Sequence, residues 1–150
     1  MKFISAIIIF IFLSTNLYSK NVQEFKTFKC KYEKGVVTNF RKDGSFGTQE
    51  TNEILEIIFS SIDFKNKTGR MIAGNVDRNI IPIKNGDTLL LIDLDEEDGD
   101  AKSTTIFNKI VSDNMFASVH SRHHNGLEIS IGMGPLPSQY YGFCKGLYSD

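Results

Sequence analysis

All three histidines of the sequence lie within five residues of one another, at positions 120, 123 and 124. Histidine titrates near neutral pH and serves as a general base, a metal ligand or a pH-sensitive contact. In a β-strand, His120 and Arg122 would share one face, whereas His123 and His124 come at the start of the following turn. Three rings placed in this way do not converge on one metal ion. We therefore predict neither a metal site nor a bound cofactor here.

The same residues fit either the polar rim of a β-structure or a rim site that binds a ligand or a partner. The guanidinium group of Arg122 is planar and pairs well with anions. Later in the chain, tyrosines precede a cysteine, and such rings pack in a core, close one end of a barrel or form a contact surface. The predicted binding residues are His120, Arg122, His123, His124, Gln139, Tyr140 and Tyr141.

Other arrangements of reactive residues are incomplete. The acidic segment at 93–100 has several carboxylates, but its sixth position is Asp98, where a calcium-binding EF-hand loop requires glycine. The sequence contains no Gly-x-Ser-x-Gly nucleophile motif and no phosphate-binding glycine loop. A hydrolase that uses His120 or His123 stays open as an alternative. It requires a histidine within hydrogen-bond reach of an Asp, Glu or Ser in a cleft.

The two cysteines, Cys30 and Cys144, lie near opposite ends of the chain. Only one intramolecular pairing is available to them, and we predict that they form a disulfide. Two free or intermolecular thiols are the alternative. A disulfide requires an oxidising compartment, which agrees with the leader described next.

The first 19 residues have the layout of a secretory signal peptide. Lys2 gives a positive start, and an apolar run of about ten residues from Ile4 to Leu13 falls short of the ~20 that cross a bilayer. A retained membrane anchor is the alternative. Cleavage after Ser19 leaves 20–150 as one domain and changes the formal charge from −1 to −2, because Lys2 is the only charged residue of the leader. This near-neutral domain has no basic run, so we expect no binding to nucleic acid and no stable membrane insertion.

Turn signals recur at intervals of about ten residues through the rest of the chain. Asn85-Gly86 and Asn125-Gly126 each separate two apolar runs. Asn-Gly is the strongest short signal for a β-hairpin, because both residues tolerate positive φ. Leu127–Met133 then alternates apolar and polar side chains, as a strand of such a hairpin does.

Some segments are harder to assign. Glu33–Gly35 predicts a turn between strands at 25–32 and 36–40, and the polar, glycine-rich stretch at 41–51 predicts an exposed loop. Asn52–Phe64 fits a helix or a strand. We expect a strand in its second half, with a short helix over 52–57 as the alternative. Pro82 lacks an amide hydrogen, so its strand should lie at a sheet edge or donate no bond at that point.

Eight to ten short strands joined by hairpins predict an all-β fold, an antiparallel up-and-down meander. A long meander buries its apolar face by folding into a sandwich or closing into a barrel. A bond between Cys30 and Cys144 would bring the first and last strands together, which favours the barrel. In shape this fold resembles lipocalin-like and other small exported barrels, including periplasmic inhibitors of hydrolases, although shape does not determine function.

The leading functional hypothesis is an exported, non-catalytic binding module in the periplasm or outside the cell. Its ligand would enter the barrel mouth or contact the rim formed by 122–126 and 134–139. The expected partner is a small apolar ligand or an envelope protein. The alternatives are an inhibitor of an envelope or secreted hydrolase, the small hydrolase described above, and a structural envelope protein that binds another copy of itself.

Overall fold

The computed structural model describes residues 21–41, 43–95, 99–112, 114–124 and 136–148. In these ranges it contains a short 3-10 helix, η1 (Val22–Glu24), and nine antiparallel strands. The strands are β1 (Thr27–Phe40), β2 (Phe46–Thr51), β3 (Leu55–Asp63), β4 (Thr68–Ala73), β5 (Val76–Asn85), β6 (Thr88–Asp95), β7 (Asp100–Ser112), β8 (Met115–His124) and β9 (Leu136–Leu147). No helix in the same ranges is long and apolar enough to cross a membrane.

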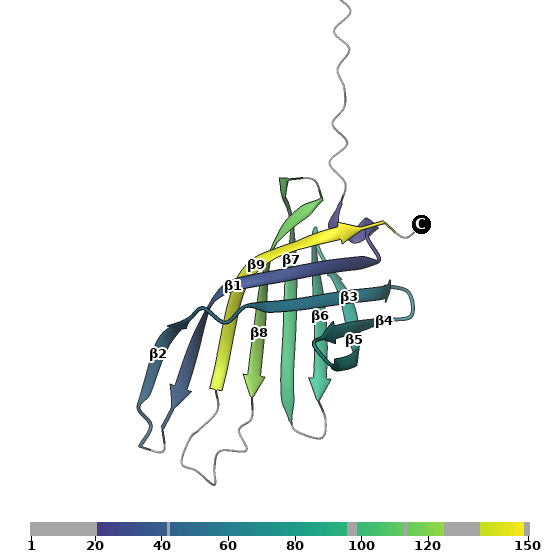
Figure 1. The fold of residues 1–150 in the computed structure, drawn as a ribbon. Helices are drawn as coiled ribbons and strands as arrows, with labels where there is room; N and C mark the ends of the chain where they lie inside the picture. The colour runs from purple at the N-terminus through teal and green to yellow at the C-terminus, as the bar shows by residue number, and fades with distance from the viewer. Residues whose placement is uncertain (1–20, 42, 96–98, 113, 125–135, 149–150) are drawn as a thin grey trace, which may run out of the picture.

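Eight of the strands close into a barrel, as the sequence predicted, and β2 extends one side of it (Figure 1). From β3 to β9 each strand pairs with the next along the chain, and β9 then pairs with β1. Cys30 of β1 and Cys144 of β9 lie directly opposite each other and form the predicted disulfide. This bond joins the two strands that close the barrel, and it indicates an oxidising compartment.

β1 is longer than predicted, because the turn expected at Glu33–Gly35 does not form. The strand continues through a bulge between Tyr32 and Lys34, and its second half pairs with β2. A Cβ at Gly35 would lie 2.6 Å from Cδ1 of the Tyr140 ring, which covers this glycine. Gly35 therefore marks a close approach of a side chain from β9 and not a turn.

The exposed loop predicted at 41–51 is also wrong in its second half. Phe46–Thr51 forms β2 and pairs with residues 35–40 of β1. None of the residues of β2 is buried. The polar composition of this segment thus reflects a strand that faces solvent on both sides, and composition alone does not distinguish such a strand from a loop.

Asn52–Phe64 contains a strand, β3, and no helix forms over 52–57. The buried side chains of β3 follow the two-residue period of a strand, at Leu55, Ile57 and Phe59. Ser61 then adopts a positive φ, and the register of β3 on β4 shifts there, so that Ile62 is buried as well. This irregularity accounts for the burial of Ile62, whereas Ile54 and Ile58, which also fit a helical period, are exposed.

Pro82 lies within β5, at a position where the sheet has a local edge. The pairing of β5 with β4 ends at Ile80, so Pro82 pairs only with Leu91 of β6. The missing amide hydrogen is tolerated because no residue of β4 is in register with it.

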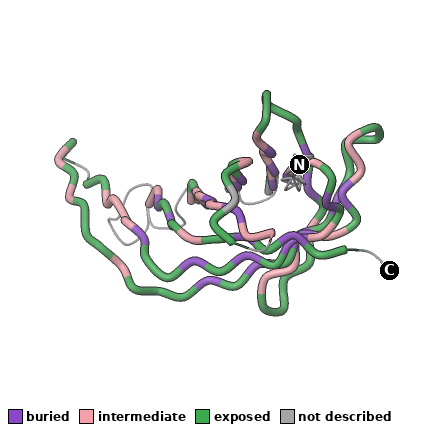
Figure 2. Tube along the Cα trace, turned by 90° about the horizontal axis from the view of Figure 1, so that it is seen from above, coloured by how far each residue is buried: buried purple, intermediate pink, exposed green. Residues whose placement is uncertain are grey.

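Apolar side chains fill the barrel at the end that η1 covers. Buried and exposed residues alternate along the strands (Figure 2). The large side chains that are almost completely buried include Phe28, Phe59, Leu89, Ile106 and Phe116. Val22 and Phe25 close this end, and the Val22 amide donates to Asn108 Oδ1 at 2.9 Å. This part of the barrel is a packed core and not a hollow lumen.

Gly142 is required where β9 crosses close to β1. A Cβ at this position would overlap the carbonyl oxygen of Lys31 and Cα of Tyr32. We expect Gly142→Ala to lower the free energy of unfolding by about 1–3 kcal/mol, because backbone atoms have to move. Urea denaturation followed by circular dichroism measures this change.

Gly47→Ala is the matched control. The nearest atom to a Cβ at Gly47 is Arg41 Nη2, at 3.8 Å, which is ordinary van der Waals contact. Its effect on the free energy of unfolding should stay within about 0.5 kcal/mol. Equal losses in the two variants would contradict the close approach at Gly142.

Candidate ligand-binding site

At the end of the barrel opposite η1, the inward side chains of β6 to β9 become polar. Strand register arranges these side chains in rows across the four strands. The deepest row is Leu89, Ile106, Ser118 and Gly142, the next is Leu91, Thr104, His120 and Tyr140, and the third is Asp93, Lys102, Arg122 and Ser138. The second and third rows, with Asp100, His124 and Glu53, are called the polar mouth below.

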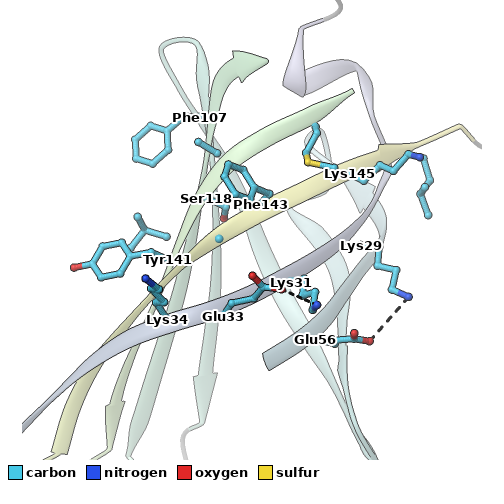
Figure 3. Close-up of a pocket in the computed structure, with 15 residues that line it drawn as sticks. Lys29, Lys31, Glu33, Lys34, Glu56, Phe107, Ser118, Tyr141, Phe143 and Lys145 are labelled. Atoms are coloured by element: carbon cyan, nitrogen blue, oxygen red, sulfur yellow. Dashed lines mark ion pairs between the residues drawn. The ribbon is translucent and has the colours of Figure 1, made fainter. Parts of the chain in front are cut away.

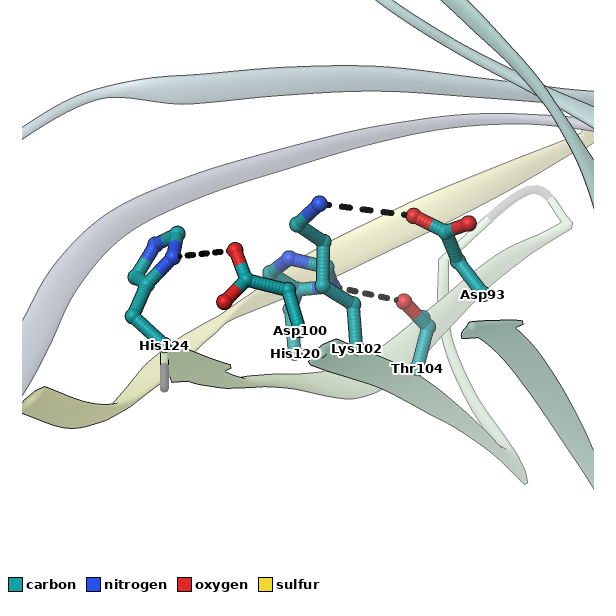
Figure 4. Close-up of polar contacts among 6 residues, drawn as sticks. All are labelled: Asp93, Asp100, Lys102, Thr104, His120 and His124. Carbon is teal, nitrogen blue, oxygen red and sulfur yellow. Dashed lines mark hydrogen bonds and ion pairs between the residues drawn. The ribbon is translucent and has the colours of Figure 1, made fainter. Parts of the chain in front are cut away.

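His120 lies in the second row, with only 2% of its surface exposed. Its Nδ1 is 2.8 Å from Oγ1 of Thr104, directly opposite on β7 (Figure 4). Burial, together with the charges of Arg122 and Lys102, lowers the pKa of His120 to about 3. The ring is therefore neutral at physiological pH, and it offers hydrogen bonds without a charge.

Tyr32 supports this row from below. Ser118 Oγ donates to the Thr105 carbonyl at 2.9 Å, so the Tyr32 hydroxyl, 3.0 Å from Ser118 Oγ, is the donor in their shared bond. Burial raises the pKa of Tyr32 to about 12. The deepest polar groups of the mouth are thus neutral and hydrogen-bonded.

The third row brings two cations together. Lys102 and Arg122 lie directly opposite each other on β7 and β8. Lys102 Nζ is 3.5 Å from Asp93 Oδ2, and Arg122 Nη1 is 3.8 Å from Glu53 Oε1. Both separations exceed the 2.7–2.9 Å or so of a strong charge-assisted hydrogen bond. Each cation therefore keeps donor capacity that its own carboxylate does not use.

Tyr140 holds Arg122 in place. The guanidinium carbon lies 4.8 Å from the centre of the Tyr140 ring, and the Tyr140 hydroxyl donates to Glu53 Oε2 at 2.7 Å. The ring thus supports the cation through a cation–π contact and also positions the carboxylate nearby. At the rim, His124 Nδ1 is 2.6 Å from Asp100 Oδ2 (Figure 4).

The predicted binding residues divide between the two faces of the sheet. His120, Arg122, His124 and Tyr140 belong to the polar mouth, and His120 and Arg122 share a face as predicted. His123, Gln139 and Tyr141 instead line a hollow on the outer surface. There the Tyr141 hydroxyl donates to Gln139 Oε1 at 3.1 Å. Strand alternation causes this division, because neighbouring residues point to opposite faces.

A small cavity of about 130 Å³ opens into the polar mouth. Lys102, His120 and Arg122 supply cationic and polar groups to its lining, and Glu56 supplies a carboxylate. The rest of the lining is apolar and consists of Leu55, Ile57, Met71, Ala73 and Val76. The barrel is thus filled near η1 and hollow near its mouth, and the hollow has both charged and apolar groups in its lining.

Sequence reasoning did not select Asp93, Lys102 and Thr104 as site residues. Lys102 and Thr104 lie on a strand without a distinctive motif, and Asp93 begins the acidic segment that fails the calcium-loop pattern. Only the register of β6, β7 and β8 places them beside His120 and Arg122. The available signal was their two-residue alternation with Leu91 and Ile106, which assigns them to the inward face.

The predicted leader, the Asn125-Gly126 hairpin, the strand at 127–133 and part of the acidic segment lie outside the described residues. In the part of the chain that the structure describes, no group of three or more His, Cys, Asp or Glu side chains is arranged to hold a metal ion. No protein-family model, curated protein or solved structure matches this chain.

Proposed function

We propose that this protein is an exported, non-catalytic binding module whose polar mouth holds a short-chain carboxylate. The observation that carries the proposal is the direct opposition of Lys102 and Arg122 beside an apolar-walled cavity. Like charges that face each other across two strands are destabilising. Asp93 and Glu53 offset part of this repulsion. An anion between Lys102 and Arg122 would offset more of it and would accept hydrogen bonds from both groups.

The shape of the cavity limits the ligand. Its volume of about 130 Å³ is several times the space that one water molecule needs but less than a typical drug-sized pocket. The carboxylate would lie between Lys102 and Arg122, and a short aliphatic chain would contact Leu55, Ile57 and Met71. The neutral ring of His120 would add a hydrogen bond without repelling or attracting the anion.

The chemistry of the histidines favours binding over hydrolysis. His120 contacts Thr104, but a pKa of about 3 makes the ring a very weak general base at neutral pH. His124 pairs with Asp100, and no serine or threonine hydroxyl among the described residues bonds to its ring. His123 is exposed on the other face of the sheet.

Export is part of the proposal. Its support is the signal-peptide layout of residues 1–19 together with the disulfide, which forms in an oxidising compartment. The periplasm or the extracellular medium fits both features. N-terminal sequencing of the secreted protein tests this part, and a mature chain that begins near Lys20 is the expected result.

Isothermal titration with sodium butyrate tests the ligand class. Butyrate should bind, whereas the neutral butan-1-ol, of similar size, should bind at least about tenfold more weakly because it does not offset the two cations. Arg122→Gln should weaken butyrate binding by a similar factor.

Lys65→Gln is the control for that variant, because Lys65 is an exposed residue between β3 and β4 and far from the polar mouth. It should leave butyrate binding unchanged. Equal binding of butyrate and butan-1-ol, or equal binding by the Arg122→Gln variant and the wild type, would overturn the anion site.

A further inference from the structure

A groove of about 720 Å³ lies on the outside of the barrel, over β1, β9 and β8 (Figure 3). It is separate from the polar mouth, because its side chains occupy the opposite face of the same strands. Its apolar lining comes mainly from Phe107, Met115, Val119, Tyr141, Phe143 and Leu147. These residues are called the outer groove below, together with Ala117 and the lysines described next.

Strand register arranges the outer groove in three columns, one each on β8, β9 and β1, and three rows of paired residues cross these columns. Val119 pairs with Tyr141, which pairs with Lys34, and Ala117 pairs with Phe143, which pairs with Lys31. In the third row, Met115 pairs with Lys145, which pairs with Lys29. The β8 column is thus apolar, the β9 column is mainly aromatic, and the β1 column is entirely lysine. In Figure 3 Lys29 and Lys31 lie across the groove from Phe107, whereas Lys34 lies beside Tyr141.

The aromatic side chains of the outer groove are exposed. Tyr141 and Phe143 each expose 47% of their surface, and Phe107 exposes 39%. The aliphatic stems of neighbouring lysines often cover such rings. Here Lys31 instead pairs with Glu33 at 2.7 Å, and Lys29 is 4.0 Å from Glu56. A contiguous apolar surface that remains uncovered in this way typically marks a contact site.

The charge of the outer groove indicates the partner. Its lining contains the lysines 29, 31, 34 and 145 and the glutamates 33 and 56. Among the described residues, neither Lys34 nor Lys145 has a carboxylate within ion-pair distance. The groove is therefore positive although the chain has a formal charge of −1. An acidic partner would be attracted to this surface and not to the molecule as a whole.

We propose that the outer groove docks an amphipathic helix of a partner protein, with an acidic stripe beside its apolar face. The apolar stripe would contact Phe107, Tyr141 and Phe143, and the acidic stripe would face Lys34 and Lys145. From Tyr141 to Leu147 the groove floor is about 20 Å long, which matches about 13 residues of α-helix.

A helix fits this surface better than the other occupants. The β9 floor already pairs with strands on both sides, so an extended peptide would find no sheet edge and would leave its own backbone groups unpaired. A second copy of this chain would bring two positive grooves together.

A designed peptide tests the proposal directly. The probe is a fluorescein-labelled helix of about 13 residues with a leucine stripe and a neighbouring glutamate stripe, and its matched peptide has lysine at every glutamate. Fluorescence anisotropy should show at least about tenfold tighter binding of the acidic peptide. Phe143→Ser should weaken that binding by a similar factor, because it removes a contact at the centre of the groove.

Charge variants separate specific docking from general attraction. Lys34→Glu/Lys145→Glu should reverse the preference between the two peptides, whereas Lys65→Glu/Lys67→Glu, which changes net charge equally at a distant turn, should preserve it.

Butyrate should not compete with the acidic peptide, since the polar mouth lies on the other face of the sheet. Failure of one proposed site therefore leaves the other standing. Equal binding of both peptides would overturn the proposal. Two further results would overturn the proposal. One is binding of the wild type to vesicles of phosphatidylglycerol and phosphatidylcholine that is lost in Phe143→Ser. The other is dimerisation of the wild type in analytical sedimentation that is lost in the same variant.

Discussion

Loss of the Cys30–Cys144 disulfide is expected to lower the free energy of unfolding by about 4–5 kcal/mol. The bond joins residues separated by 114 positions, so it restricts the unfolded chain strongly. It also joins β1 to β9, the pairing that closes the barrel. For a domain of this size the loss corresponds to a decrease in Tm of about 10–20 °C. Urea and thermal denaturation of the oxidised protein and of a Cys30→Ala/Cys144→Ala variant measure both quantities.

A reductant distinguishes the bond from the packing of the two side chains. Both cysteines are completely buried, so the alanine variant also loses some apolar contact. Reductant should destabilise the wild type by most of the same amount and should leave the variant unchanged. A wild-type midpoint that does not move after complete reduction, verified by thiol titration, would show that the barrel closes without the bond.

The fold was predictable because the signals that define it are local. Asn85-Gly86 lies at the turn that joins β5 to β6, as its hairpin signal predicts. Once hairpins follow one another, the order of strands in the sheet is largely determined. The cysteines then supplied the one long-range constraint, which favoured closure over a sandwich.

The errors arise where a local signal has a distant cause. Gly35 is a glycine because the Tyr140 ring covers it, and Tyr140 lies far away in the sequence. A turn glycine and a glycine under an aromatic ring look the same until both strands are placed. The polar segment at 46–51 fits a loop for a similar reason, since β2 has no buried face to produce an alternating pattern.

The polar mouth was predictable only in part. The sequence indicated that His120 and Arg122 share a face, because that relation depends on alternation within one strand. The partners of these residues depend on register between strands. Thr104 lies opposite His120, and Lys102 lies opposite Arg122, through the specific pairing of β7 with β8. A shift of one residue in that register would replace both partners with outward-facing side chains.

Acidification should destabilise this protein through His120. Its pKa is about 3 in the folded chain and 6.5 in the reference state, so between these values the unfolded chain binds a proton that the folded chain does not. Stability is therefore unaffected by this group above about pH 7 and falls as the pH decreases below 6.5, by up to about 1.4 kcal/mol per pH unit. Between pH 7.5 and 4.5 the expected loss is about 2–3 kcal/mol.

Urea denaturation at a series of pH values measures this slope in the wild type and in His120→Gln. The variant removes the titrating ring, so its stability should change much less across the same interval, even if it is lower throughout. His123→Gln is the matched control, since His123 is exposed on the outer face, and it should keep the wild-type slope. Parallel pH profiles for the wild type and His120→Gln would mean that His120 has the same pKa in the folded and the unfolded chain. In that case His120 would be a cation beside Lys102 and Arg122, and the polar mouth would attract anions more strongly than its neutral form allows.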